Sequence, residues 1–353
     1  MPAPFTRYLV CFGASGLAVF LAAWAYIAFA PMAFSESGYA SWKAKQAMLD
    51  GCQLGQLAFF GDSRLEAGVI PALLATPSIN FGLPAGTPIE THSAVRRAVA
   101  CANPPAQAVI ALTPSHLAAV SRFFWLLSVR YGFISFEELR ETERWADRLG
   151  DAETLATPTA DGLTGKLRDV LYAIHFPTLS FSSLVQGQVF RRYSGNVARF
   201  GEVIRDRGWS EYTGAGGARV VPEMTVPFAP PKLQKAEFEA AVGLLRQRGV
   251  EVLLLVLPFA EGNVPDPSSQ QAYVAYLREL AQRPGVHVVT DELPVWPEGL
   301  FVDGEHLNGA GARAFTAKLA QCMSSGRLQP GCDLRWTAAT AGQLPSPVLQ
   351  VQQ

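Results

Sequence analysis

Short apolar runs alternate with amphipathic stretches of helical period along most of this 353-residue chain. The runs end at Gly, Pro or a polar turn residue, and such runs are typical of strands buried on both faces of a sheet. The pattern therefore predicts an α/β fold in which helices cover both faces of a parallel sheet. The expected strands are Leu57–Gly61, Ser78–Gly82, Gln107–Leu112, Glu251–Leu257 and Val286–Thr290. The expected helices are Ile89–Cys101, Pro231–Arg248, Ser268–Gln282 and Gly309–Met323.

A different pattern occupies the N-terminus, where the stretch from Tyr8 to Ser35 contains no charged side chain and is apolar almost throughout. About 20 residues at a rise of roughly 1.5 Å cross the hydrocarbon core of a bilayer, so this stretch is long enough to span it. We expect residues 1–35 to form one transmembrane anchor. Arg7 favours a cytoplasmic N-terminus and an extracytoplasmic remainder, although Lys43 and Lys45 weaken that asymmetry.

A cleaved signal peptide is the alternative for this stretch, and a buried helix of a soluble protein is a further one. The apolar region of a signal peptide usually covers about 7 to 15 residues, fewer than are present here. The small-x-small candidate for cleavage, Ala28–Ala30, is followed by Pro31, which is unfavourable at that place. We therefore favour an anchor that is retained.

Composition limits the classes of partner. The chain has 29 Lys and Arg against 30 Asp and Glu, only 17% charged residues, and a mean hydropathy of +0.15. The low share of charge indicates that part of the chain does not face water. Because nucleic acid is bound by clustered Lys and Arg and the chain has no long basic run, no nucleic-acid partner is expected.

The cysteine distribution agrees with an oxidising compartment. Cys11 lies in the apolar N-terminal run, Cys52 and Cys101 come early, and Cys322 and Cys332 come late. The count allows two disulfides. We expect the early pair and the late pair each to be joined; the alternative is that all are buried thiols.

The α/β pattern is interrupted by one long insertion. Residues 36–116 and 231–326 are expected to form the two parts of one domain, and residues 117–230 a helical insertion or cap that ends in an extended loop. The aromatic residues between Phe123 and Phe133 are expected in a core, with a substrate cleft or the membrane surface as the alternative. Residues 327–353, with several Pro and a terminal Gln pair, are expected to form a flexible tail.

The first candidate for chemistry is the sequence Gly61-Asp62-Ser63-Arg64-Leu65, which begins at the end of the first expected strand. A serine there lies at the carboxyl end of a parallel sheet, where open α/β folds place their sites. A turn of Gly, Asp and Ser needs no chemistry to explain it, so this block by itself is a weak indication.

The second candidate is the sequence Asp303-Gly304-Glu305-His306-Leu307-Asn308, which precedes the last expected helix. A serine hydroxyl becomes a good nucleophile when an imidazole takes its proton, and a carboxylate on the other ring nitrogen fixes the tautomer. An Asp three residues before a His allows one short loop to hold that pair. A surface loop with a helix cap is the alternative.

In order and in residues, these blocks resemble the SGNH (GDSL-type) hydrolase superfamily. The resemblance covers residues 57–82, 109–116 and 293–323, and it includes Asn80-Phe81-Gly82 at the end of the second strand. It implies a flavodoxin-like three-layer sandwich with a central parallel sheet, preceded here by one transmembrane helix.

The resemblance also implies roles for individual residues. Ser63 would be the nucleophile, His306 the general base and then acid, and Asp303 the residue that orients it. The backbone N–H groups of Ser63 and Gly82 would form the oxyanion hole, where one donor can be worth about 3 kcal/mol. Arg64, beside the nucleophile, is expected either to contact an anionic group of the substrate or to pair with a neighbouring carboxylate.

The third block departs from the family. The family usually has Gly-x-Asn-Asp after the third strand, with the Asn side chain completing the oxyanion hole, whereas this chain has Leu112-Thr113-Pro114-Ser115-His116. Ser115 is a candidate donor in place of that Asn, and the alternative is that the third donor is absent. His116, at the start of a helix, is expected on the surface, and the alternative is that it reaches the site.

The amino-acid sequences of these blocks are similar to those of membrane-anchored SGNH-like proteins of bacterial envelopes, which work beside membrane-bound O-acyltransferases. The likeness implies an O-acyltransferase or esterase of the inner (cytoplasmic) membrane, with its catalytic domain in the periplasm. Through an acyl-Ser63 intermediate it would move or remove an acetyl-like group on an envelope polysaccharide. The implied partners are an acylated glycan or other acyl donor or acceptor and a membrane-bound O-acyltransferase, with no metal or other cofactor. The alternatives are a non-catalytic glycan-binding or accessory subunit and a soluble lipase-like hydrolase.

Overall fold

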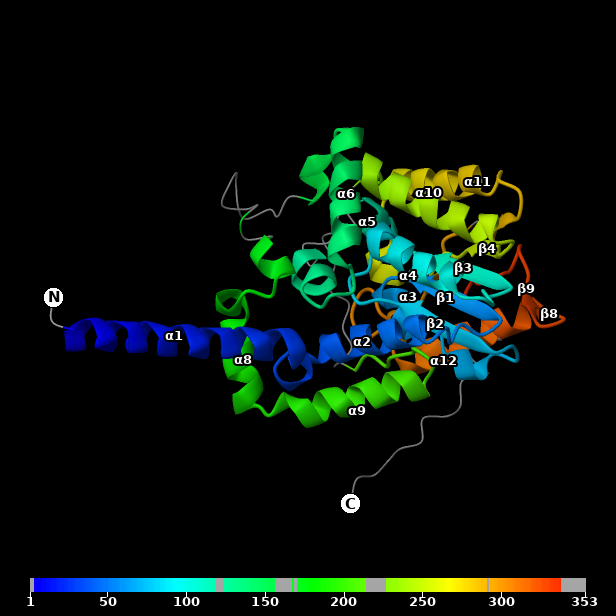
Figure 1. The fold of residues 1–353 in the computed structure, drawn as a ribbon. Helices are drawn as coiled ribbons and strands as arrows, with labels where there is room; N and C mark the ends of the chain where they lie inside the picture. The colour runs from blue at the N-terminus through cyan, green and yellow to red at the C-terminus, as the bar shows by residue number, and fades with distance from the viewer. Residues whose placement is uncertain are drawn as a thin grey trace, which may run out of the picture.

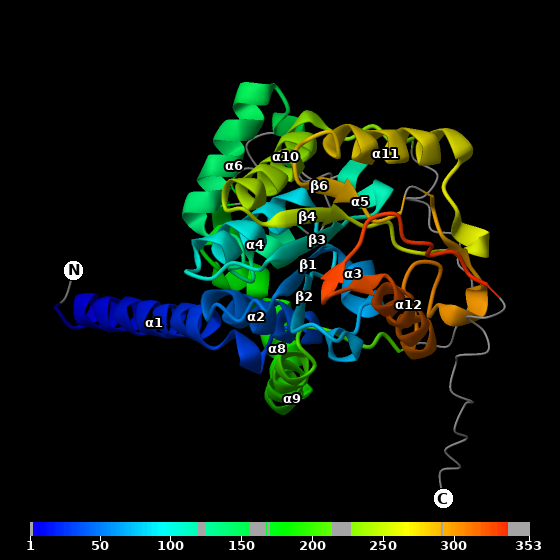
Figure 2. The ribbon, with the colours of Figure 1, turned by 90° about the vertical axis from the view of Figure 1, so that its right-hand side faces the viewer.

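The computed structural model describes residues 3–118, 124–155, 167, 170–213, 227–290 and 292–337. The protein has the expected α/β fold: five parallel strands form one sheet in the order β2-β1-β3-β4-β6, and helices flank it (Figures 1 and 2). Counted along the chain, this is the 2-1-3-4-5 order of flavodoxin-like folds. The strands are β1 (Leu57–Gly61), β2 (Ser78–Gly82), β3 (Gln107–Ala111), β4 (Glu251–Leu254) and β6 (Val286–Val288).

The four expected helices are present, with ends that differ by at most two residues from the sequence-based ranges. They are α4 (Pro88–Ala100), α10 (Lys232–Gln247), α11 (Pro267–Leu280) and α12 (Gly309–Gln321). Two further helices surround the first strand and are not predicted by the pattern: α2 (Ser37–Asp50) before β1 and the short α3 (Ser63–Gly68) after it. A small parallel pair, β5 (Phe259–Ala260) and β7 (Val295–Trp296), lies beyond the main sheet.

Hydrophobic cores lie on both faces of the sheet. Successive side chains of a strand point to opposite faces. Ala58 and Phe60 belong to the core formed with α2, α4 and α10, whereas Leu57 and Phe59 belong to the core formed with α3 and α12. All residues of β1 are buried, which explains why its sequence is apolar without alternation.

The N-terminal apolar stretch forms α1 (Ala3–Phe29), which projects away from the sheet (Figure 1). Among the described residues it is the one helix long and apolar enough to cross a membrane, by length and composition only, and a signal sequence meets the same test. An apolar N-terminal helix together with two disulfides indicates an extracytoplasmic domain that carries an anchor or a signal.

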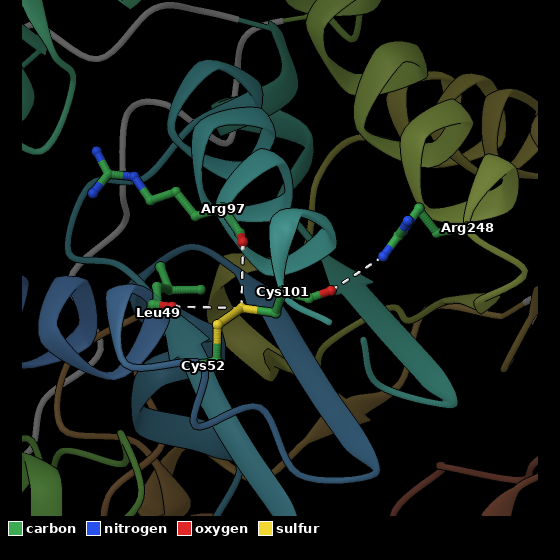
Figure 3. The surroundings of a disulfide bond; sticks show 5 residues. All are labelled: Leu49, Cys52, Arg97, Cys101 and Arg248. Carbon is green, nitrogen blue, oxygen red and sulfur yellow. Dashed lines mark hydrogen bonds between the residues drawn. A yellow bond between two sulfur atoms is a disulfide. The ribbon is translucent and has the colours of Figure 1, made fainter. Parts of the chain in front are cut away.

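Both expected disulfides are confirmed. Cys52–Cys101 joins the turn after α2 to the end of α4 (Figure 3), and Cys322–Cys332 joins the end of α12 to the C-terminal segment. Beside the first bond, Arg248 donates to the carbonyl oxygen of Cys101 at 3.1 Å (Figure 3). The first disulfide therefore ties α2, which follows the apolar helix α1, to the sheet domain.

The insertion is helical in its described part. It begins within α5 (Pro114–Ala118) and contains the π-helical η3 (Phe124–Val129), α6 (Phe136–Leu149), α8 (Pro177–Val189) and α9 (Arg192–Arg205). The aromatic residues from Phe124 to Phe133 are buried in the core, as expected, and Phe123 lies outside the described residues. The extended loop expected at the end of the insertion is described only in part, because residues 214–226 lie outside the described residues.

The C-terminal segment differs from the expected flexible tail. β8 (Met323–Ser324) pairs with β9 (Arg327–Leu328), and both Leu328 and Leu334 are buried. Trp296 donates its indole N–H to the carbonyl oxygen of Leu334 at 2.9 Å. Apolar residues placed between the prolines and glycines thus hold residues 327–337 on the domain, and residues 338–353 lie outside the described part.

Candidate active site

Ser63 lies where β1 ends and α3 begins, at the carboxyl edge of the sheet. The side chain of Asp62 caps α3, because its Oδ1 accepts from the backbone N–H groups of Arg64 at 2.9 Å and Leu65 at 3.4 Å. Ser63 is the first residue of that helix, a position whose N–H has no acceptor within the helix. The local backbone therefore sets the direction of the Ser63 side chain.

The ring of His306 faces Ser63. His306 Nε2 lies 2.8 Å from Ser63 Oγ, and His306 Nδ1 lies 3.0 Å from Oδ2 of Asp303. Ser63 and His306 are 243 residues apart in the sequence. The structure thus brings together, within hydrogen-bond distance, the three residues that the two sequence blocks single out.

A tight loop holds Asp303 against the ring. Oδ1 of Asp303 accepts from the backbone N–H groups of Glu305 and His306, each at 2.8 Å, and the Val302 N–H donates to the His306 carbonyl oxygen at 2.8 Å. Burial opposes the charge of Asp303, but His306 and the two N–H groups outweigh it and hold the pKa of the carboxyl well below its usual range. Asp303 is therefore a carboxylate at neutral pH, suited to orient His306 and to stabilise its cation.

Residues that the sequence blocks do not single out support the His306 ring. The ring of Tyr212 stacks on it, with centroids 4.6 Å apart and 8° between the planes, and its hydroxyl donates to Oε2 of Glu66 at 3.0 Å. Glu66 Oε1 lies 2.8 Å from Nζ of Lys45, and both side chains are buried. Lys45 also donates to the carbonyl oxygen of Gly82. A chain of contacts therefore runs from α2 through α3 to His306.

Burial and charge oppose each other in this network. Burial disfavours an ionised Glu66, but Lys45 outweighs it and lowers the pKa of the Glu66 carboxyl. Burial lowers the pKa of the Lys45 ammonium against the attraction of Glu66. Burial also raises the pKa of Tyr212 well above its usual value, so its hydroxyl stays protonated and can donate to Glu66.

The segment after β3 contacts Asp62. Oδ2 of Asp62 accepts from the backbone N–H of Thr113 at 2.7 Å and from its hydroxyl at 2.9 Å, and it lies 3.3 Å from Nδ1 of His116. The surface position expected for His116 is wrong: only 25% of its side chain is exposed, because the fully buried Asp62 attracts the ring. Ser115 donates to the Thr113 hydroxyl oxygen at 3.3 Å, so it belongs to this cluster, and its role as third oxyanion donor stays a prediction.

We expect the ion pair of His116 with Asp62 to stabilise the fold most in mild acid. Burial opposes a charge on His116, but Asp62 outweighs it and raises the pKa of His116; burial likewise opposes the charge of Asp62, but His116 outweighs it and lowers the pKa of Asp62. The raised histidine pKa means that its stabilisation is full below the unfolded value of about 6.5 and is lost as the pH rises through the folded value. Because the pKa of Asp62 is lowered, the stabilisation that Asp62 contributes is full down to its unfolded pKa of about 4.

His116→Gln should therefore lower the free energy of unfolding by roughly 1–3 kcal/mol at about pH 5.5 and by less at about pH 8.5. Urea unfolding of both proteins in the same detergent, followed by tryptophan fluorescence, measures the two differences. An equal or larger loss at the higher pH would contradict the expectation.

Gly82 ends β2 beside the start of α3. A Cβ atom there would lie 2.5 Å from the backbone nitrogen of Glu66, so only glycine fits. The Gly82 N–H donates to Oδ1 of Asn80 at 2.9 Å, and the Asn80 amide donates to the carbonyl oxygen of Leu65 at 2.8 Å. The predicted oxyanion donor thus lies against α3, with its N–H engaged by Asn80. Its use by an oxyanion stays a prediction.

Arg64 is buried beside Ser63. Its guanidinium lies over the ring of Phe259, 4.2 Å from the centroid, and donates to the carbonyl oxygen of Pro258. Nε and Nη1 of Arg64 have no hydrogen-bond partner in the described part of the chain. These nitrogens leave the guanidinium able to donate to a bound group, and its contact with substrate stays a prediction.

The fold and these contacts define an α/β protein whose serine, histidine and aspartate are arranged for activation of a serine hydroxyl. No protein-family model matches the chain, and no curated protein matches it. What the site does therefore rests on its own geometry, together with the sequence blocks that form it.

Proposed function

We propose that the protein is a membrane-tethered serine O-acyltransferase or esterase of the SGNH type. It acts on an acetyl-like group of an envelope polysaccharide, from the extracytoplasmic (periplasmic) side of the inner membrane. The observation that carries the proposal is the hydrogen-bond chain from Ser63 through His306 to Asp303, with distances of 2.8 and 3.0 Å. The order of the sequence blocks and the apolar helix α1 support the tethered class.

The geometry supports a reaction in two steps. As Ser63 Oγ attacks the carbonyl carbon of an acyl ester, its proton passes to Nε2 of His306, and Asp303 stabilises the resulting cation. His306 then gives the proton to the leaving oxygen, the ester C–O bond breaks, and the acyl group remains on Ser63. In the second step a sugar hydroxyl or water gives its proton to His306 and attacks the acyl carbon; the bond from that carbon to Ser63 Oγ then breaks, and His306 returns the proton to Ser63. Transferase and esterase differ only in that acceptor.

The second candidate is a non-catalytic glycan-binding or accessory subunit of a membrane-bound O-acyltransferase system. Its support is the oxyanion region, where Asn80 engages the Gly82 N–H and no Asn follows β3 at the place of the family's third donor. Loss of one oxyanion donor lowers kcat by about 10²–10³-fold, so a site without these donors would turn over esters slowly.

Labelling with a fluorophosphonate probe distinguishes the two candidates. Full-length protein in detergent is treated with the probe and digested, and the modified peptide is sequenced by mass spectrometry; we expect the phosphonyl group on Ser63. Heat-denatured protein is the control, because labelling needs an activated hydroxyl. An unlabelled Ser63, with an authentic serine esterase labelled in parallel, would favour the accessory role. The acyl content of an acetylated polysaccharide, measured with and without a glycan acceptor, then separates transfer from hydrolysis.

A further inference from the structure

One face of α8 is apolar and uncovered. Phe181, Val185 and Val189 recur at intervals of four residues, and 63%, 45% and 69% of their surfaces are exposed. This spacing places the three side chains on one side of the helix. Exposed apolar side chains aligned in a row are typical of a surface that contacts a membrane or another protein.

The other side of α8 is packed onto the protein, so the free face is well defined. Ser180, Ser183 and Gly187 are buried. Gly187 lies so close to the segment after α1 that a Cβ atom would be 2.3 Å from Cα of Phe34. Ser183 accepts a hydrogen bond from Arg130 at 2.7 Å. The row of Phe181, Val185 and Val189 therefore faces outward.

The insertion is bonded to the C-terminal part of the membrane helix. Trp24 of α1 donates its indole N–H to the carbonyl oxygen of Ile174 at 2.9 Å, and Gln188 of α8 donates to the Tyr26 hydroxyl at 2.7 Å. Trp and Tyr are enriched where membrane helices leave the hydrocarbon core. Figure 1 shows α8 running across α1 at this level, as a helix lying in the membrane plane would.

The charges around α8 suit a phospholipid surface. No residue from Pro177 to Phe190 is charged, and Arg191 and Arg192 follow immediately. Cations at the rim of an apolar face are placed to meet lipid phosphates, as in interfacial helices.

The geometry points to α8 as an interfacial helix that lies in the outer leaflet of the bilayer that α1 spans, with the row of Phe181, Val185 and Val189 among the lipid chains. This inference goes beyond the proposed chemistry and rests on α1 remaining in the membrane. With α1 and α8 both in the bilayer, the domain is held at two places and cannot swing freely about one helix. Ser63 and His306 therefore keep one orientation to the membrane surface.

Site-directed spin labelling tests the inference on the full-length protein in nanodiscs of phosphatidylcholine and phosphatidylglycerol. A nitroxide is attached to Val185→Cys in a Cys11→Ser background, without reductant so that the disulfides stay closed. Leu73→Cys is the matched control, since Leu73 is an aliphatic residue with 49% of its surface exposed. Leu73 lies three residues before Thr76, whose hydroxyl donates a hydrogen bond to the carbonyl oxygen of Gly326 between β8 and β9. These two strands lie at the end of the domain far from α1 (Figure 1). A nitroxide on the native Cys11 reports whether α1 is inserted.

We expect collisions with oxygen to exceed those with a water-soluble nickel chelate at positions 185 and 11, and the reverse at position 73. A position 185 that behaves like position 73 would overturn the inference, as would a water-exposed Cys11. A label at 185 that is shielded from both reagents would also overturn it, because a protein surface would then cover α8.

Discussion

Ser63→Ala should abolish both ester turnover and fluorophosphonate labelling. The variant keeps the turn between β1 and α3, because the Asp62 side chain still caps the helix. It loses the oxygen that lies 2.8 Å from His306 Nε2, and with it the atom that would carry the acyl group. Removing the nucleophile from such an arrangement lowers kcat by about 10⁴–10⁶-fold, the residual rate coming from binding and oxyanion stabilisation.

Turnover of an acetyl ester by purified full-length protein measures this loss. Ser93→Ala is the matched control, since Ser93 is a buried serine on α4 whose hydroxyl donates to Glu138 rather than to His306. The control should keep the activity of the unchanged protein within about threefold, as expected for a substitution away from the reacting atoms. A Ser63→Ala protein that retained a tenth or more of the turnover would show that another group carries the chemistry.

The sheet could be predicted because its strands are buried on both faces. β1 and β2 match the sequence-based ranges residue for residue, since each is a short, fully buried run that stops at a glycine. At Gly82 the stop has a steric cause, the close approach of the backbone of Glu66. β4 ends three residues before the predicted Leu257, because apolar residues continue into the buried turn after the strand.

The site was predictable only where local sequence builds it. Ser63 and the Asp303–His306 loop each occupy a single turn at the end of an element, so their blocks can be recognised from sequence. Tyr212 comes from the far end of the insertion and meets His306 only after the chain has folded. The surface position expected for His116 was wrong for the same reason, since its partner Asp62 lies on another strand end. Contacts between residues far apart in the sequence produce neither a hydrophobic period nor a short motif that could be recognised from sequence.

Lys45 illustrates the limit most clearly. Its position in the sequence gives no sign of burial, and lysine is almost never fully buried unless it is paired. In the structure 0% of its side chain and 1% of that of Glu66 are exposed, and the pair lies between α2 and the helix of the nucleophile. The pairing needs tertiary structure to bring the two helices together, and only then does the lysine become part of the support of the site.

Lys45→Met should destabilise the protein by about 3–5 kcal/mol, because it leaves the buried Glu66 carboxylate without its counter-ion. The loss should depend on pH in a definite direction. In the unchanged protein Lys45 keeps the pKa of the Glu66 carboxyl low. Glu66 therefore stabilises the fold fully at pH values above the pKa of the unfolded chain, and this stabilisation is lost as the pH falls through the lowered pKa of the folded protein. In the variant Lys45 no longer offsets burial, which raises that pKa against the remaining hydrogen bonds to Glu66, so protonation relieves the penalty in acid. The difference between the two proteins should therefore grow from acid to neutral pH.

The double variant Lys45→Met, Glu66→Gln is the matched control for this charge. Gln keeps an acceptor for the Tyr212 hydroxyl, which donates to Glu66 at 3.0 Å, and removes the unpaired charge. We expect urea unfolding at neutral pH to show the double variant as more stable than Lys45→Met alone, a non-additivity typical of residues in contact. Losses that simply add would mean that the two charges do not stabilise each other. A flat pH dependence would mean that Glu66 is protonated already in the unchanged protein.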